Sequence, residues 1–124
     1  ARVRAVVEMV NAGIQPLQNL SVLAKVAETQ EGRHAWAKHW NERGLAALEA
    51  LLGQYEALGH RGRYAFGDTL GAADCVLVPQ VYGARRFGVD VAAYPRVLRA
   101  ATAALEDPRV ASAAPERQPD AVPA

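Results

Sequence analysis

The chain has 124 residues, 51% of them hydrophobic and 22% charged, which supports one globular domain with a single core. Its formal net charge of +1 excludes the strongly basic class of nucleic-acid-binding domains and gives no reason to expect a membrane surface as partner. One cysteine, Cys75, excludes an internal disulfide and fits a reducing compartment, and we find no signal peptide or bilayer-length apolar run, so we expect a cytoplasmic protein.

The first element is predicted to be a helix, because four valines follow the spacing i, i+3, i+4, i+7 of one buried stripe. Gly13 is available for a left-handed residue at its end. Ala1 lies inside the pattern with no capping residue before it, which we interpret as a helix whose start lies upstream; the alternative is a terminal helix that is merely frayed. The stripe consists of Val3, Val6, Val7 and Val10.

The second helix is expected to begin near Pro16, whose fixed φ suits a first helical turn, and to continue to about Glu28. On that helix Gln15, Gln18 and Asn19 would share one face. Side-chain amides both donate and accept hydrogen bonds, and they suit a ligand rich in peptide groups and carboxylates. The alternative is that these amides simply face water at a helix start.

A third helix is predicted from about Glu31 to Tyr55, followed by a turn or loop from His60 to Gly67. Gly44 falls on the same face as the apolar residues, where a glycine weakens a helix, so we expect another helix to approach closely there. The predicted inner face consists of Trp36, Trp40, Leu48, Leu51, Leu52 and Tyr55.

The segment from Leu70 to Phe87 is the most apolar in the chain. A helix that is apolar all round belongs at the centre of a core, although the short run Val76–Val78 also suits a strand. The start of the segment favours a helix over about residues 71–86, because Gly71 can be an N-cap and Asp74 can return a carboxylate to the free N–H groups.

The last helix of the fold is expected from Ala92 to about Leu105, and Asp107-Pro108 begins one more short turn. From Pro115 the Pro- and Ala-rich end is predicted to be an extended tail on the surface. The sequence therefore predicts an all-α domain over residues 1–114 with a tail over residues 115–124.

Known catalytic constellations are missing from the sequence: it contains no defensible Ser-His-Asp set, phosphate loop or paired carboxylates. The three histidines lie at spacings of no metal motif, so we expect no metal site. We interpret Asp74 as a structural cap and Cys75 as a buried, inert thiol. Arg85 and Arg86 point about 100° apart on a helix; they either stabilise its C-terminus or one of them binds a carboxylate.

Several motifs spread over the chain resemble the C-terminal helical domain of zeta-class glutathione transferases, the class of the maleylacetoacetate and maleylpyruvate isomerases. The segment Gly13–Leu23 and the motif Leu77-Val-Pro-Gln-Val81 are specific to the class, whereas Ala73-Asp74 is common to the superfamily. Further matches are Gly44–Glu49, Gly67-Asp68, Arg86-Phe87, Val89-Asp90, Tyr94-Pro95 and Arg117-Gln-Pro-Asp120.

The resemblance implies a glutathione-transferase-like helical bundle around a buried central helix. In the family a preceding thioredoxin-like domain, absent from this chain, binds most of the glutathione cofactor, and the full-length subunit forms a homodimer. Carried over by position, Arg86 would hold a substrate carboxylate, and Asp74 and Gly71 would cap the core helix. The residues implied to line the glutathione site are Gln15, Asn19, Leu20 and Ser21.

The implied reaction is glutathione-dependent isomerisation of maleylacetoacetate to fumarylacetoacetate in aromatic amino-acid catabolism, with this chain alone inactive. A maleylpyruvate isomerase or a general glutathione transferase is the alternative within the family, and a stand-alone helical interaction module is the alternative outside it. Two positions depart from the family pattern. Gly71 replaces a hydroxyl residue, with little effect on capping, and Gly83 replaces an asparagine, which leaves the acceptor preference open.

Overall fold

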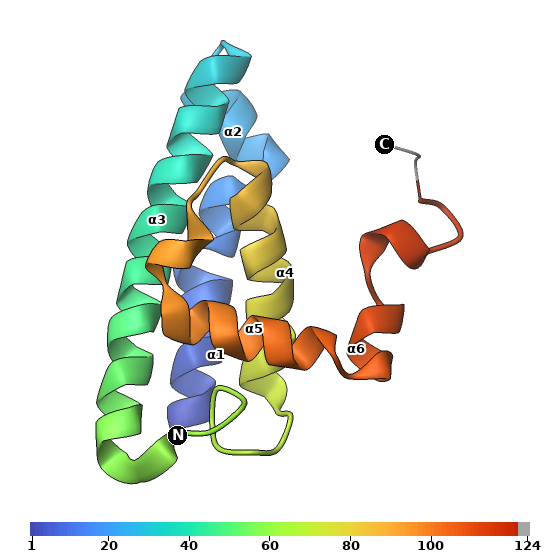
Figure 1. The fold of residues 1–124 in the computed structure, drawn as a ribbon. Coiled ribbons are helices and arrows are strands. Elements are labelled where there is room, and N and C mark those ends of the chain that lie inside the picture. The colour runs from blue at the N-terminus through green and yellow to red at the C-terminus, as the bar shows by residue number, and fades with distance from the viewer. Residues whose placement is uncertain (122–124) are drawn as a thin grey trace.

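All regular elements in residues 1–121, the part of the chain that the computed structural model describes, are helical (Figure 1), as predicted. The α-helices are α1 (Arg2–Gly13), α2 (Leu20–Val26), α3 (Gln30–Tyr55), α4 (Ala72–Arg86), α5 (Pro95–Leu105) and α6 (Pro108–Ser112). Single short turns are η1 (Gln15–Gln18), η2 (Glu56–His60), η3 (Val91–Ala93) and η4 (Pro115–Arg117). None of the helices described is long and apolar enough to span a membrane.

Helices α1, α3 and α4 lie alongside one another, and α5 crosses them (Figure 1). Each of these four helices buries the residues of one side, because its outer side has no neighbour. The largest fully buried apolar side chains are Val6 and Val10 of α1, Leu45, Leu48 and Leu52 of α3, Leu77 of α4, Val97 of α5, and Ile14, which lies between α1 and η1.

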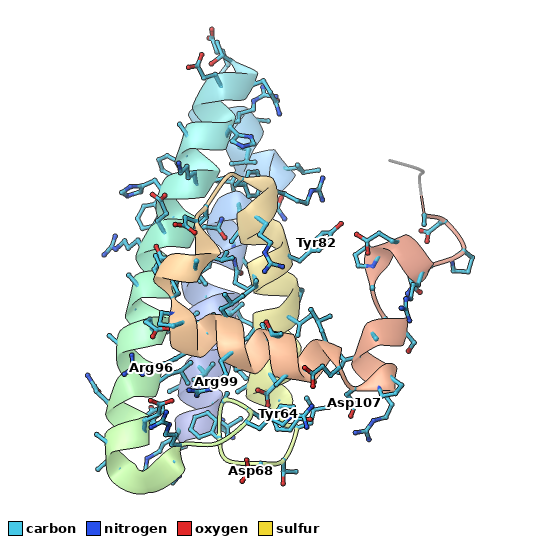
Figure 2. The ribbon with its side chains drawn as sticks, viewed as in Figure 1. Tyr64, Asp68, Tyr82, Arg96, Arg99 and Asp107 are labelled. Carbon is cyan, nitrogen blue, oxygen red and sulfur yellow. The ribbon has the colours of Figure 1, made fainter. Side chains whose placement is uncertain are left out.

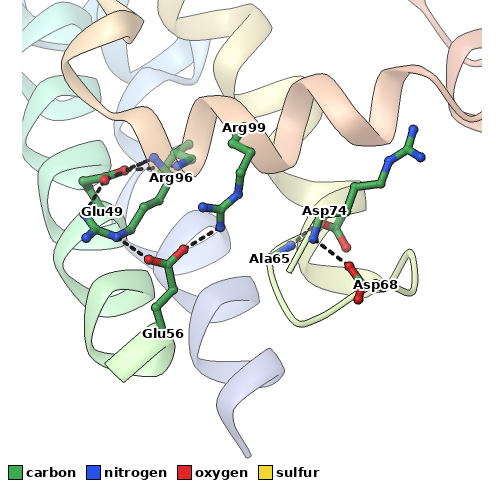
Figure 3. Close-up of polar contacts among 9 residues, drawn as sticks. Glu49, Glu56, Ala65, Asp68, Asp74, Arg96 and Arg99 are labelled. Atoms are coloured by element: carbon green, nitrogen blue, oxygen red, sulfur yellow. Dashed lines mark hydrogen bonds and ion pairs between the residues drawn. The ribbon is translucent and has the colours of Figure 1, made fainter. Parts of the chain in front are cut away.

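The start of α4 is held by one buried carboxylate, as predicted. Gly71 is the N-cap of the helix. Asp74, which is 1% exposed, accepts a hydrogen bond from the backbone N–H of Gly71 at 2.9 Å. The second oxygen of Asp74 accepts from the N–H of Ala65 at 2.8 Å (Figure 3), which ties the preceding loop to the helix. Gly71 has no side chain to return a bond, so only half of a capping box is present.

Helix α4 is not buried all round, and the prediction that Cys75 is buried is wrong. Cys75 and Tyr82 are exposed, whereas Leu77 and Ala84 are buried. Helices α1, α3 and α5 cover only one side of α4. The outer side borders a cavity of about 710 Å³ that reaches the C-terminal segment. Apolar composition therefore did not reveal which side of α4 lacks a neighbour.

The junction between α1 and η1 differs from the prediction. Gly13 belongs to α1 and has no left-handed backbone; Ile14, with φ of −122°, ends the helix. The fully buried Ile14 side chain packs against Gly44, where an added Cβ would lie 2.3 Å from Ile14 Cγ1. The close approach predicted at Gly44 is therefore confirmed, with the Ile14 side chain as the group that approaches.

Two predicted buried stripes are narrower than expected. Of the four valines of α1, only Val6 and Val10 are fully buried, and Val3 is 39% exposed. On α3 the tryptophans Trp36 and Trp40 are only half-buried. The buried face of α3 consists of Ala37, Asn41, Leu45, Leu48 and Leu52.

Helix α5 takes its N-terminal cap from α3. The Glu49 carboxylate accepts hydrogen bonds from the backbone N–H groups of Arg96 at 2.9 Å and Val97 at 3.1 Å (Figure 3). Glu56 forms ion pairs with Arg96 at 2.9 Å and Arg99 at 2.6 Å. Burial raises the pKa of Glu56, but the two arginines outweigh burial and hold it below its ordinary value. This stabilisation is lost only as the pH falls through the lowered pKa.

The C-terminal segment begins as predicted, with Asp107 as the N-cap of α6. Tyr82 points from α4 toward this segment (Figure 2) and donates a hydrogen bond to Glu116 at 2.6 Å. The predicted tail is not wholly extended, because Pro115–Arg117 forms a 3₁₀ turn that Gln118 stabilises through two backbone carbonyls. The last part of the predicted tail, residues 122–124, lies outside the described residues.

Candidate functional site

The amide-rich segment is divided into two elements and is not one helix. Gln15 and Gln18 belong to η1, and Asn19 has an extended backbone with φ of −62° and ψ of 139°. The Asn19 side chain caps α2, accepting hydrogen bonds from the N–H and the hydroxyl of Ser21 at 3.0 and 2.8 Å. The prediction of a shared helical face is therefore wrong, because an asparagine that caps the next helix cannot continue the previous one.

Four side-chain amides from three parts of the fold form one continuous chain of hydrogen bonds. Gln15 Nε2 donates to Gln80 Oε1 at 3.4 Å, and Gln80 Nε2 donates to Asn41 Oδ1 at 2.5 Å. Asn41 Nδ2 donates to Gln18 Oε1 at 2.7 Å. Gln80 and Asn41 are fully buried. We call these four residues the amide chain; it links η1 to α3 and α4.

Two further contacts fix η1 on the bundle. Trp36 Nε1 donates a hydrogen bond to the backbone carbonyl of Leu17 at 2.9 Å. Ile14, directly before η1, packs against Gly44 of α3. Because η1 has few hydrogen bonds of its own, these contacts to α3 determine where Gln15 and Gln18 lie.

Beside η1 the structure has a cavity of about 550 Å³ between α2, α3 and the end of α4. Of the predicted site residues, Leu20 and Arg86 line this cavity; Gln15, Asn19 and Ser21 do not, and all three are exposed. The lining residues are Gln18, Leu20, Leu23, Gln30, Arg33, His34, Gly83, Arg86 and Phe87.

The polar part of this cavity suits an anionic ligand. Arg86, the last residue of α4, is exposed there, and Arg33 enters from α3 with its Nε donating to the carbonyl of Ala27 at 2.9 Å. Guanidinium groups bind carboxylates through parallel hydrogen bonds. A Cβ at Gly83 would contact only Gln18 Nε2, at 3.7 Å, so the glycine leaves room at this wall. Arg85 lines the other cavity, so the two arginines diverge as predicted.

The larger cavity contains none of the predicted site residues. It lies between the outer side of α4 and the C-terminal segment and is lined mainly by apolar side chains. Its edge carries the Tyr82–Glu116 hydrogen bond, which raises the pKa of Tyr82 and lowers that of Glu116. Within residues 1–121 no three His, Cys, Asp or Glu side chains are grouped so that they could hold a metal ion.

Sequence reasoning missed Asn41 and Gln80 as parts of the site. Each is an uncharged polar residue at a position where the helix stripe is otherwise apolar: Asn41 lies four residues after Ala37 and four before Leu45, and Gln80 lies three after Leu77. A polar residue in a buried stripe requires a partner. The sequence therefore indicates that Asn41 and Gln80 each need a hydrogen-bond partner, but it does not identify that partner.

Comparison with known proteins decides the family. A family model described as "Glutathione S-transferase, C-terminal domain" matches residues 38–106. The chain belongs to this family. The transferase domain is 46% identical, over 99% of its length, to "Probable maleylacetoacetate isomerase 2" of Drosophila melanogaster, of which it covers 51%. It is 42% identical, over 96% of its length, to "Maleylpyruvate isomerase" of Ralstonia sp, of which it covers 57%.

A solved structure agrees with this assignment. The maleylacetoacetate isomerase of Anaeromyxobacter dehalogenans 2CP-1, with dicarboxyethyl glutathione and citrate bound in its active site, matches with a TM-score of 0.89 and 45% identity. The match covers 98% of the transferase domain and 54% of that chain. The domain therefore spans about half the length of the relatives that it matches.

Proposed function

We propose that this chain is the helical half of a glutathione-dependent cis–trans isomerase that converts maleylacetoacetate to fumarylacetoacetate. In this proposal an N-terminal thioredoxin-like domain provides the other half of the glutathione site, and the two-domain subunit forms a cytoplasmic homodimer. The observation that carries the proposal is the cavity where Arg86 of α4 and Gln18 of η1 meet, next to the segment Gln15–Ser21. The names of the relatives support the choice of reaction.

The reaction requires addition and later loss of a thiolate. The glutathione sulfur adds to the conjugated carbon–carbon double bond, and the electron pair of that bond moves into the neighbouring carbonyl to form an enolate. The former double bond is now single and rotates. Collapse of the enolate then expels the thiolate and leaves the trans double bond. Arg86 would hold a substrate carboxylate while η1 and the start of α2 orient glutathione, and the other domain would lower the thiol pKa.

The reaction itself is the first test. We expect the two-domain protein to isomerise maleylacetoacetate only when glutathione is present, and this chain alone to be inactive, because thiol activation belongs to the other domain. The measurement is turnover with and without glutathione for both proteins. Turnover by this chain alone, or none by the two-domain protein, would contradict the proposal. Because a maleylpyruvate isomerase is among the relatives, the ratio of kcat/KM for the two acids decides between the two substrates.

Removing two exposed amides should weaken glutathione binding. In the two-domain protein we expect Gln15→Ala combined with Asn19→Ala to raise the KM for glutathione about tenfold. Each substitution removes a proposed hydrogen bond to a charged or peptide group of glutathione. The Asn19 cap accounts for about 1 kcal/mol of stability, so the midpoint of thermal unfolding is measured in parallel. The control is Asn11→Ala with Gln54→Ala, two exposed amides outside the site. An unchanged KM for glutathione would mean that Gln15 and Asn19 are surface residues only.

A further inference from the structure

The amide chain has a fixed direction, because one of its contacts is with a backbone carbonyl. The carbonyl of Ala37 can only accept, so the group of Asn41 that lies 2.8 Å from it must be the Nδ2 amide. The Oδ1 of Asn41 therefore faces Gln80, which must donate to it. This one carbonyl thus assigns donor and acceptor to each amide along the chain.

The same logic orients Gln18. The second N–H of Asn41 Nδ2 donates to Gln18 Oε1 at 2.7 Å, so this oxygen is already engaged. Gln18 Nε2 lies on the other side, toward Gly83 and the cavity that Arg86 lines. No hydrogen bond from Gln18 Nε2 to another group is formed within residues 1–121. Rotating the Gln18 amide by 180° would place its Nε2 against Nδ2 of Asn41, so that two hydrogen-bond donors would face each other.

At the position of Gln18 the cavity wall therefore presents a hydrogen-bond donor, Nε2, in the cavity that Arg86 also lines. We propose that Gln18 is a further substrate-binding residue: its Nε2 donates to an oxygen of the carboxylate that Arg86 holds, and Asn41 is the positioning residue that keeps the amide in this orientation. The inference rests on the proposed function, and it adds that a ligand group at this wall must be an acceptor. A glutamine without such a network could present either its oxygen or its nitrogen.

The decisive substitution is Gln18→Glu in the two-domain protein. The new carboxylate keeps an oxygen that can accept from Asn41, but an oxygen replaces the amide N–H that faces the cavity. We expect the KM for the acid to rise about tenfold or more, because a hydrogen bond to a charged group is lost and a repulsion is added. The KM for glutathione should change far less, because Gln18 Nε2 faces the cavity that Arg86 lines. Gln54→Glu, the same change at an exposed position of α3, is the control for net charge.

The positioning role has its own test. With Asn41→Asp, an oxygen replaces the Nδ2 that faces Gln18, so Gln18 is expected to turn its Nε2 toward the new acceptor and its oxygen toward the cavity. The KM for the acid should then rise while kcat and the KM for glutathione change little, a split that general destabilisation does not produce. If this variant does not fold, Gln18→Glu and the uncharged Gln18→Met decide whether the Gln18 amide binds the acid substrate.

Three results would overturn the inference: an unchanged KM for the acid in Gln18→Glu, an equal rise in Gln54→Glu, or a rise confined to the KM for glutathione. Arg86→Ala in the same series separates this inference from the proposed function. If Arg86→Ala raises the KM for the acid and Gln18→Glu does not, only the role of Gln18 fails. If neither substitution changes it, the cavity is not the acid site and the proposed function loses its main support.

Discussion

Replacing Asp74 with asparagine is expected to lower the free energy of unfolding by about 2–4 kcal/mol, because one of the two backbone N–H groups that this buried carboxylate accepts from loses its acceptor. One Asp74 oxygen accepts from Ala65 and the other from Gly71, and the residue is 1% exposed. Asparagine keeps one acceptor, but its NH₂ group then faces the remaining N–H. Urea unfolding followed by circular dichroism measures the change.

The loop before α4 supplies a matched control for this substitution. Asp68 accepts a hydrogen bond from the N–H of Arg63 at 3.0 Å, and its carboxylate is exposed. Asp68→Asn makes the same chemical change at a position where water can replace the lost hydrogen bond. We therefore expect it to lower the free energy of unfolding by less than about 1 kcal/mol. Equal effects at the two positions would mean that burial of Asp74 is not what makes it important.

Replacing Arg86 with alanine is expected to raise the KM for the acid substrate about 10- to 100-fold in the two-domain protein, because the cavity loses a charged donor that can bind a carboxylate with two parallel hydrogen bonds. The KM for glutathione should change far less. Arg86→Lys keeps the charge but not the paired geometry, so an intermediate KM is expected. Steady-state kinetics with each substrate varied in turn give both constants.

The neighbouring arginine is the control for Arg86. Arg85 is also exposed at the end of α4 but lines the other cavity. Arg85→Ala removes the same charge from the same helix terminus, and we expect the KM for the acid to stay within about twofold. If Arg85→Ala and Arg86→Ala raise this KM equally, the effect is one of net charge, and the binding role of Arg86 is wrong.

The sequence predicted the long helices α1, α3, α4 and α5 well, because each of them buries several residues at helical spacing. It also predicted the start of α4 at Gly71, since capping depends on residues only three positions apart. The error at Asn19 has a local cause. The periodicity of three amides favoured one helix, but an asparagine with the residues that follow it can equally begin a new one, and the structure has this second arrangement.

Other features depend on contacts that periodicity does not contain. Exposure of Cys75 follows from which side of α4 the neighbouring helices cover, and an apolar helix gives no indication of that side. The hydrogen bond between Asn41 and Gln80 joins residues 39 positions apart. Their polarity in buried stripes signals that each requires a partner. Only the packing of α3 against α4 shows that Asn41 and Gln80 are partners of each other. Their hydrogen bond in turn determines how the Gln18 amide is oriented.

The cap that Glu49 provides for α5 has a consequence for folding. Helix α5 has 11 residues, too few for a stable isolated helix in water. Its first N–H groups are satisfied by a carboxylate that lies 47 positions earlier in the chain, on α3. The first turn of α5 therefore gains its hydrogen bonds only after α3 has formed and docked. Ordering of these two helices is thereby cooperative, and α5 should open and close with the bundle as one unit.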